Sequence, residues 1–186
     1  MDAKGTAVKT IPAFVKSAYP HEYFNWIESL PQISKEIMLN PIMATDWFSA
    51  TDAIIIPTTS IAEKFFNYDI KKAAWQLGRY SSDIALKGIY KIFIKITTPG
   101  FILSRASSML ETYYRPCTVK VVESKERSAT VLFSGFPPDT EVIFYRIGGW
   151  AENTFEAVKC KNVSITFDFK YNTESKQVMM YCKWEQ

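Results

Sequence analysis

Histidine is almost missing from this chain of 186 residues, in which His21 is the single example. Imidazole is the commonest general acid or base and the commonest metal ligand, so sites of both kinds have one place to form. His21 lies in "YPHEYF", without HExxH spacing, and no GxSxG elbow occurs in the chain. We therefore expect a histidine at the surface or at a helix cap, no metal, and a protein that is not an enzyme.

Cysteine and glycine are also scarce, with three and seven residues respectively. Cys117, Cys160 and Cys182 are an odd number with no CxxC pair, which argues against a disulfide framework and predicts small buried free thiols. Neither GxGxxG nor GxxxxGK[ST] occurs, so the sequence predicts no phosphate loop and no cofactor.

The chain has little net charge and no long apolar run. The net charge is +3 with Lys and Arg scattered, and the basic face of Lys87, Lys91 and Lys95 is typical of a solvated helix rather than a nucleic-acid site. No apolar run reaches the ~18 residues of a membrane span, and the first residues lack a signal peptide's apolar core. We expect a cytoplasmic protein that binds no nucleic acid.

Aromatic residues, in contrast, are plentiful: Phe, Tyr and Trp make up 15% of the chain. So many rings either fill a large core or line a cavity, and composition favours neither.

The hydrophobic pattern predicts helices first and strands afterwards. We expect an opening strand over 5–11, short helices over 12–39, a helix after Thr59 or Ser60, a long helix over 69–97 and another from Thr98 to Pro116. Strands are expected over 117–124, 128–136, 162–172 and 177–185, with a helix capped by Asp139 or Thr140 between the two pairs. This order indicates an α+β fold in which a helical N-terminal layer (about 12–115) packs on a small antiparallel sheet from the C-terminal half (about 116–186), within a single domain 1–186.

Two adjacent glycines, Gly148 and Gly149, interrupt the helical pattern of "YRIGGWAENTFEAVKC". Each costs about 1 kcal/mol relative to alanine in a helix, so either a ligand's phosphate or another element should approach there. Because the pattern before them is helical, close packing against the sheet or the long helix is favoured.

Two arginines lie in mostly apolar helices, Arg79 in "WQLGRYSSDIAL" and Arg105 in "FILSRASSML". Each either extends its charged end to solvent or pairs with a nearby carboxylate (Asp83 or Glu111), or else it anchors an acidic group of a ligand in an aromatic-lined pocket. The first interpretation is favoured for both.

The Gly-Arg helix, the Thr-Pro helix start and "GGWAENTFEAVKCKNVSITF" before a last strand that ends in Trp184 resemble the vinyl-reductase-type and heme-NO-binding-like domain superfamily. Small core subunits of the TRAPP transport complex share this fold. The resemblance covers most of residues 40–186 and implies helices over a small antiparallel sheet, and a domain that senses or holds a small hydrophobic molecule.

The chain departs from several features of that superfamily. It has no histidine in its middle to ligate iron and no Tyr-x-Ser-x-Arg motif, so heme is not expected. Clustered cysteines are missing too, and no local motif transfers the acylated cysteine of the TRAPP subunits to this chain.

The leading hypothesis is a non-enzymatic sensor or binding domain for an apolar or amphipathic molecule. Its candidate ligand-binding residues are six aromatic walls and two polar anchors: Trp47, Phe65, Trp75, Tyr90, Phe93, Trp150, Arg79 and Arg105. The alternative is an interaction or scaffold domain with a filled core that acts through a homodimer or a signalling partner.

Overall fold

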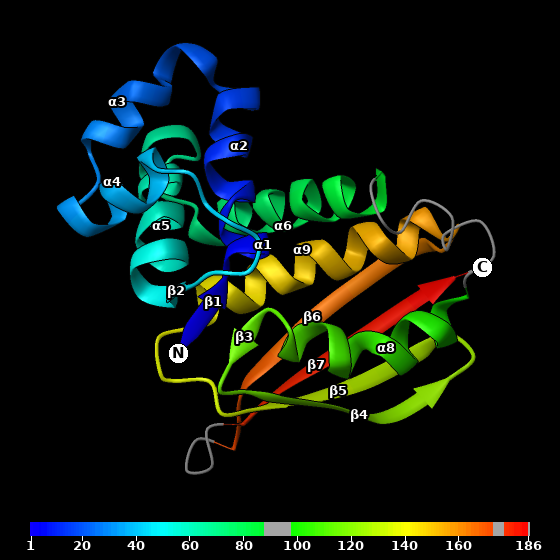
Figure 1. Cartoon of the computed structure of the whole chain (residues 1–186). Coiled ribbons are helices and arrows are strands. Elements are labelled where there is room, and N and C mark those ends of the chain that lie inside the picture. Colours follow the sequence, from blue (N-terminus) through cyan, green and yellow to red (C-terminus); the bar gives the residue numbers. More distant parts are fainter. Residues whose placement is uncertain (88–97, 173–176, 186) are drawn as a thin grey trace.

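Four antiparallel strands from the C-terminal half form the larger sheet, in the order β4-β5-β7-β6. Their bounds are Thr118–Lys125 (β4), Ser128–Ser134 (β5), Lys161–Asn172 (β6) and Gln177–Glu185 (β7). The computed structural model describes residues 1–87, 98–172 and 177–185. The expected strands and the α+β fold are confirmed (Figure 1).

Alternation of side chains explains why one face of this sheet is covered. In β5, Ala129, Val131 and Phe133 are buried, whereas the residues between them are partly exposed. Successive strand residues point to opposite faces, so these three share the covered face. Val131 pairs with Met180 of β7, which places both at the centre of the sheet.

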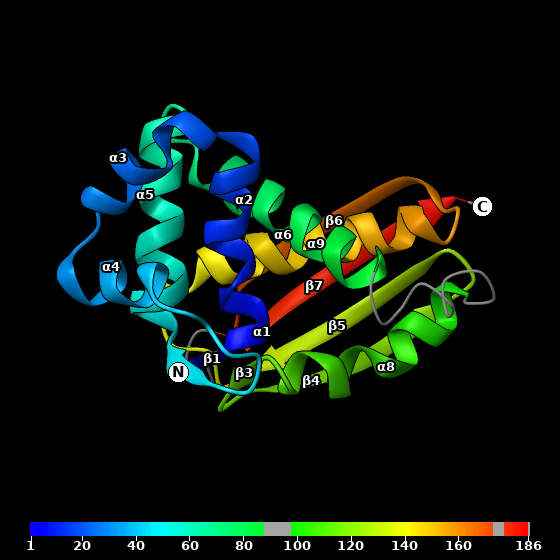
Figure 2. The ribbon, with the colours of Figure 1, turned by 45° about the horizontal axis from the view of Figure 1, so that its top comes forward.

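Two helices lie over the sheet, and a third packs on one of them (Figures 1 and 2). Helix α9 (Glu141–Ala157) packs along β6, α8 (Pro99–Glu111) packs along β4, and α6 (Ile70–Lys87) packs on α9. The covering helices therefore come from both halves of the chain, rather than from an N-terminal layer alone.

The N-terminal part folds as a group of short helices beside these layers (Figure 2). They are α1 (Gly5–Val8), α2 (Thr10–Ala18), η1 (Pro20–Glu22), α3 (Tyr23–Glu28), α4 (Gln32–Leu39), the π-helical turn η2 (Thr51–Ile55) and α5 (Ile56–Phe65). Three short strands, β1 (Asp2–Lys4), β2 (Trp47–Ser49) and β3 (Tyr114–Arg115), form a second sheet in the order β2-β1-β3.

The expected opening strand over 5–11 is wrong, because that segment is helical and the strand is β1. Pro12 occupies the first turn of α2, where its missing N–H is tolerated. Val8 and Ile11 are completely buried, so packing outweighs the strand preference of these β-branched residues.

Helix boundaries differ from expectation elsewhere as well. Helix α5 begins at Ile56 rather than after Thr59, because η2 runs directly into it. The long helix is described as far as Lys87, and the rest of its predicted range lies outside the described residues. Thr98 does cap α8, since its side chain accepts a hydrogen bond from the Phe101 N–H at 3.3 Å. None of the helices in the described ranges is long and apolar enough to cross a membrane.

The close packing expected at the glycine pair is confirmed. A Cβ atom on Gly149 would overlap the backbone of Trp75 in α6, and one on Gly148 would overlap the Trp75 ring. Gly78 of α6 has the reciprocal role, because its Cβ would overlap the Arg146 carbonyl of α9. Small residues therefore let the two helices meet at backbone distance.

Candidate functional site

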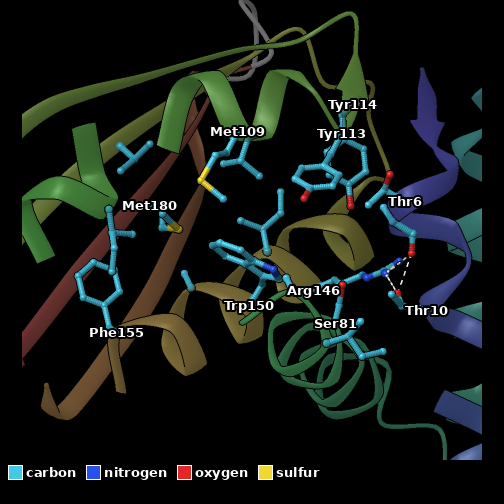
Figure 3. A pocket seen from close by; sticks show the side chains of 18 of the residues that line it. Thr6, Thr10, Ser81, Met109, Tyr113, Tyr114, Arg146, Trp150, Phe155 and Met180 are labelled. Carbon is cyan, nitrogen blue, oxygen red and sulfur yellow. Dashed lines mark hydrogen bonds between the residues drawn. The ribbon is translucent and has the colours of Figure 1, made fainter. Parts of the chain in front are cut away.

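A cavity of about 330 Å³ lies between α8, α9, α6 and the sheet. Central sheet residues, three helices and the α1–α2 segment all contribute to it (Figure 3). Its lining is Thr6, Ala7, Lys9, Thr10, Ser81, Ile84, Ala85, Ile102, Leu103, Met109, Leu110, Tyr113, Tyr114, Val131, Arg146, Ile147, Trp150, Ala151, Phe155 and Met180. Cavities of this size hold small organic molecules in other proteins.

Most of this lining is apolar. The strand pair Val131 and Met180 forms the sheet side, and successive turns of α9 supply Ile147, Ala151 and Phe155. These α9 positions recur at three or four residues, which places them on one face of the helix. The cavity therefore suits a hydrophobic molecule over much of its length.

The polar residues gather at the end of the cavity near α1 and α2 (Figure 3). Arg146 reaches from α9 and donates two hydrogen bonds of 2.6 Å from Nη2, to the carbonyl oxygen of Ala7 and to Thr10 Oγ1. Its Nη1 atom is buried and has no hydrogen-bond partner among the described residues. A guanidinium group is thus held at one end of an apolar cavity with donors unused.

This end of the cavity has an excess of positive charge. Arg146 is 3% exposed, and its pKa is lowered by burial, with Tyr114 as a smaller opposing influence. An arginine nevertheless keeps its charge inside proteins. The lining also includes the exposed Lys9, and none of its described residues is Asp or Glu. A buried cation without a carboxylate partner is uncommon, because charges leave water at considerable cost.

The structure brings one of the predicted site residues, Trp150, to this cavity. Tyr90 and Phe93 lie outside the described residues. Phe65 instead stacks on Tyr19 in the N-terminal helices, with ring centroids 4.1 Å apart.

Trp75 and Arg79 belong to a polar network on the surface of the α6–α9 contact. The Trp75 indole donates to Glu152 Oε2 at 2.8 Å, and Arg79 pairs with Glu152 and with Glu156. Its salt bridges raise the pKa of Arg79, with the Glu156 hydrogen bond as the largest cause. The expected pairing of Arg79 with a carboxylate is confirmed, but Asp83 is the wrong partner and instead accepts from Asn153.

Trp47 and Arg105 likewise have neighbours outside the cavity. The Arg115 guanidinium lies 4.0 Å above the Trp47 ring. Arg105 is exposed and lies 5.6 Å from the Phe101 ring. Its suggested partner Glu111 accepts a hydrogen bond from the Val119 N–H instead.

Sequence reasoning missed Arg146, the most unusual residue of the site. It lies in "VIFYRIGGW", an apolar helical stretch much like those that drew attention to Arg79 and Arg105. The criterion used for those two residues, an arginine within a mostly apolar helical stretch, would also have selected Arg146.

A heme iron, which the resemblance raises, would need an axial ligand at this cavity. Iron in heme proteins is held by His, Cys thiolate, Tyr or a Met that accompanies His. His21 lies in the exposed turn η1, away from the cavity lining. Burial raises the pKa of Tyr114, which keeps its phenol protonated, and the lining sulfurs are the thioethers of Met109 and Met180.

The three cysteine thiols do not supply an axial ligand for a heme iron either. Cys117, Cys160 and Cys182 are outside the lining. Burial raises the pKa of Cys117 to about 11 and that of Cys182 to about 12, which disfavours the thiolate that binds iron. The described residues of the cavity therefore supply no His and no Cys thiolate to ligate a heme iron.

Comparison with known proteins shows where the fold occurs. No model of a protein family and no curated protein sequence matches the chain. Solved structures do match over almost the whole length. An Fe(II) unliganded H-NOX protein from K. algicida is 10% identical, with 98% of this chain and 97% of that chain covered and a TM-score of 0.74. An H-NOX protein from S. oneidensis in the Fe(II)NO state is 10% identical, with 98% and 99% covered and a TM-score of 0.72. The chain therefore has the heme-NO-binding-like fold that its sequence suggested.

Proposed function

We propose that this chain is a non-enzymatic binding domain of the sensor type, which holds an apolar or amphipathic small molecule between α8, α9 and the sheet. The observation that carries the proposal is the cavity of about 330 Å³, mostly apolar and with polar groups at one end. Ligand sites commonly combine hydrophobic walls with a few convergent polar groups in this way.

Binding is favoured over catalysis by the chemistry of the lining. Its described side chains include Ser81 and two threonines as hydroxyl groups, but no His, Cys, Asp or Glu that would act as a general base beside them. A bound molecule would thus be held and oriented rather than attacked.

The structural neighbours support a sensor role as an analogy. Those proteins are described as H-NOX proteins with Fe(II) or Fe(II)NO centres. Since the described lining supplies no His and no Cys thiolate for a heme iron, we propose that this chain keeps the scaffold and holds a different occupant.

The alternative, a scaffold with a filled core, is less well supported because the interior contains this cavity. A sensor still needs something to read its bound state. We therefore retain a second copy of the chain or a separate signalling protein as the proposed partner, and solution mass measured with and without ligand tests the first of these.

The experiment is native mass spectrometry of the full chain, together with thermal shifts in the presence of decanol and naphthalene. We expect a co-purified small molecule or a rise in Tm with these compounds. The variant Ala151→Leu, which projects into the cavity, should remove the effect. Ala157→Leu on the same helix is exposed and should preserve it.

Absence of any co-purified mass together with no response to either compound would overturn the proposal. So would a response that Ala151→Leu leaves intact, because the ligand would then be bound elsewhere.

A further inference from the structure

Arg146 has an unusual combination of burial, charge and missing partners. It is 3% exposed, Nη2 is fully used by Ala7 and Thr10, and Nη1 has no partner among the described residues. None of the ion pairs between described residues includes it. The two hydrogen bonds fix the guanidinium without neutralising it.

We propose that Arg146 binds the carboxylate group of an amphipathic ligand whose apolar part lies along α9 toward Phe155. This inference rests on the proposed function, because it names the chemical class of molecule that the same cavity holds. A carboxylate is the natural complement of a guanidinium, since charge-assisted N–H···O bonds are short and strong.

The surroundings of Arg146 favour an anion over a neutral head group. Lys9 adds a second positive charge to the lining, in which no acidic residue occurs among the residues that the structure describes. Tyr114 lies close enough for the cation to influence its pKa, although burial has the larger effect and raises it. A protonated phenol and two cations all attract negative charge.

The shape of the site indicates a ligand with a polar end and an apolar tail. Figure 3 shows Arg146, Thr6 and Thr10 at one end and Phe155 and Met180 toward the other. Residues 146 and 155 are nine apart on α9, which is about 13 Å at 1.5 Å per residue. An extended alkyl chain needs roughly ten to eleven carbon–carbon bonds to span that length, so a ten-carbon molecule covers most of it.

Decanoate and decanol are therefore the matched probes, since they differ in the head group and share the ten-carbon tail. Calorimetric titration of the full chain at pH 7.5 should show decanoate binding about ten to a hundred times more tightly than decanol, the usual range for a charged hydrogen-bonded pair.

Variants assign that preference to Arg146. Arg146→Met should reduce decanoate affinity by about tenfold or more and leave decanol nearly unchanged, whereas Arg146→Lys should restore part of the loss. Arg105→Met is the matched control, because it removes the same charge from an exposed position outside the cavity.

The comparison of decanoate with decanol on the unmodified chain needs no variant, so it tests the preference for a carboxylate even if Arg146→Met does not fold. Equal affinity for both probes would overturn the carboxylate inference and leave the proposed function standing. If neither probe binds, nor naphthalene, both proposals fail. A decanoate preference that survives Arg146→Met in a folded protein would also refute the role of Arg146.

Discussion

Gly78 of α6 packs directly against the carbonyl group of Arg146 in α9, with no room for a Cβ atom between them. Gly149 of α9 makes the reciprocal approach to the backbone of Trp75. The residue that carries the proposed ligand contact therefore lies at a backbone-to-backbone contact between α6 and α9.

Substitution of Gly78 by alanine should destabilise the fold. The added methyl group meets backbone atoms, which cannot turn aside as a flexible side chain would, and overpacking of this kind costs about 1–3 kcal/mol. We expect a lower midpoint in urea denaturation. An unchanged midpoint would contradict the backbone contact.

Gly100→Ala is the control for that substitution. Gly100 lies in the first turn of α8, and the nearest atom to its added Cβ is Thr98 Oγ1 at 3.9 Å. Alanine there should be neutral or stabilise the fold by up to about 1 kcal/mol, because it restricts the unfolded chain.

The polar network of α6 and α9 gives a second prediction. Glu152 is 21% exposed and accepts from the Trp75 indole while it pairs with Arg79. Glu152→Leu leaves the Trp75 indole without its acceptor and Arg79 with Glu156 alone, so the free energy of unfolding should fall by about 1–3 kcal/mol. Chemical denaturation at two salt concentrations measures it.

Glu156→Leu provides the comparison, because Glu156 also pairs with Arg79 but is 43% exposed. Exposed ion pairs contribute about 0–1 kcal/mol, and salt screens them further. Equal losses for the two variants would mean that the burial of Glu152 does not matter.

Sequence periodicity was sufficient for the central architecture. The alternation in β5 and the three-and-four spacing in α9 both reflect burial on one face, which is a local property of the chain. The opening segment was predicted incorrectly because Val8 and Ile11 are β-branched, which favours strands, yet both are completely buried within helices by contacts of the folded chain. Such contacts do not appear in the hydrophobic periodicity of the sequence.

The site was harder to predict than the fold for the same reason. Trp75 and Trp150 both lie in amphipathic helices, yet one faces Glu152 and the other faces the cavity. Which ring lines a hollow depends on how α6, α8 and α9 are placed together. Pairings across more than 70 residues, such as Arg79 with Glu152, are equally invisible in a local pattern.

The thiols predict a dependence on alkaline pH. The folded-state pKa of Cys117 is about 11 and that of Cys182 about 12, both raised mainly by burial, whereas an unfolded cysteine has a pKa of about 8.5. Because the unfolded thiols lose their protons first, the free energy of unfolding is constant below about pH 8.5 and falls as the pH rises toward 11. We expect Tm to be level from pH 6 to 8 and to drop by pH 10.5.

Removal of one thiol isolates this effect from tyrosine and lysine titration. Cys182→Ala should lower Tm at pH 7 through the lost packing but should show a smaller further fall between pH 8 and 10.5 than the unmodified chain. A parallel pH profile for the two proteins would exclude the thiol as the cause.

Ligand binding should be visible through Trp150, which lines the middle of the cavity between Arg146 and Met180 (Figure 3). A molecule placed against the indole changes its polarity and contacts, so tryptophan emission should shift when decanoate is added. Trp150→Phe should remove most of the change. Trp47→Phe should preserve it, because Trp47 packs under Arg115 outside the lining. If Trp47→Phe abolished the response and Trp150→Phe did not, the ligand would be bound at the small sheet, and the cavity between α8 and α9 would have a different role.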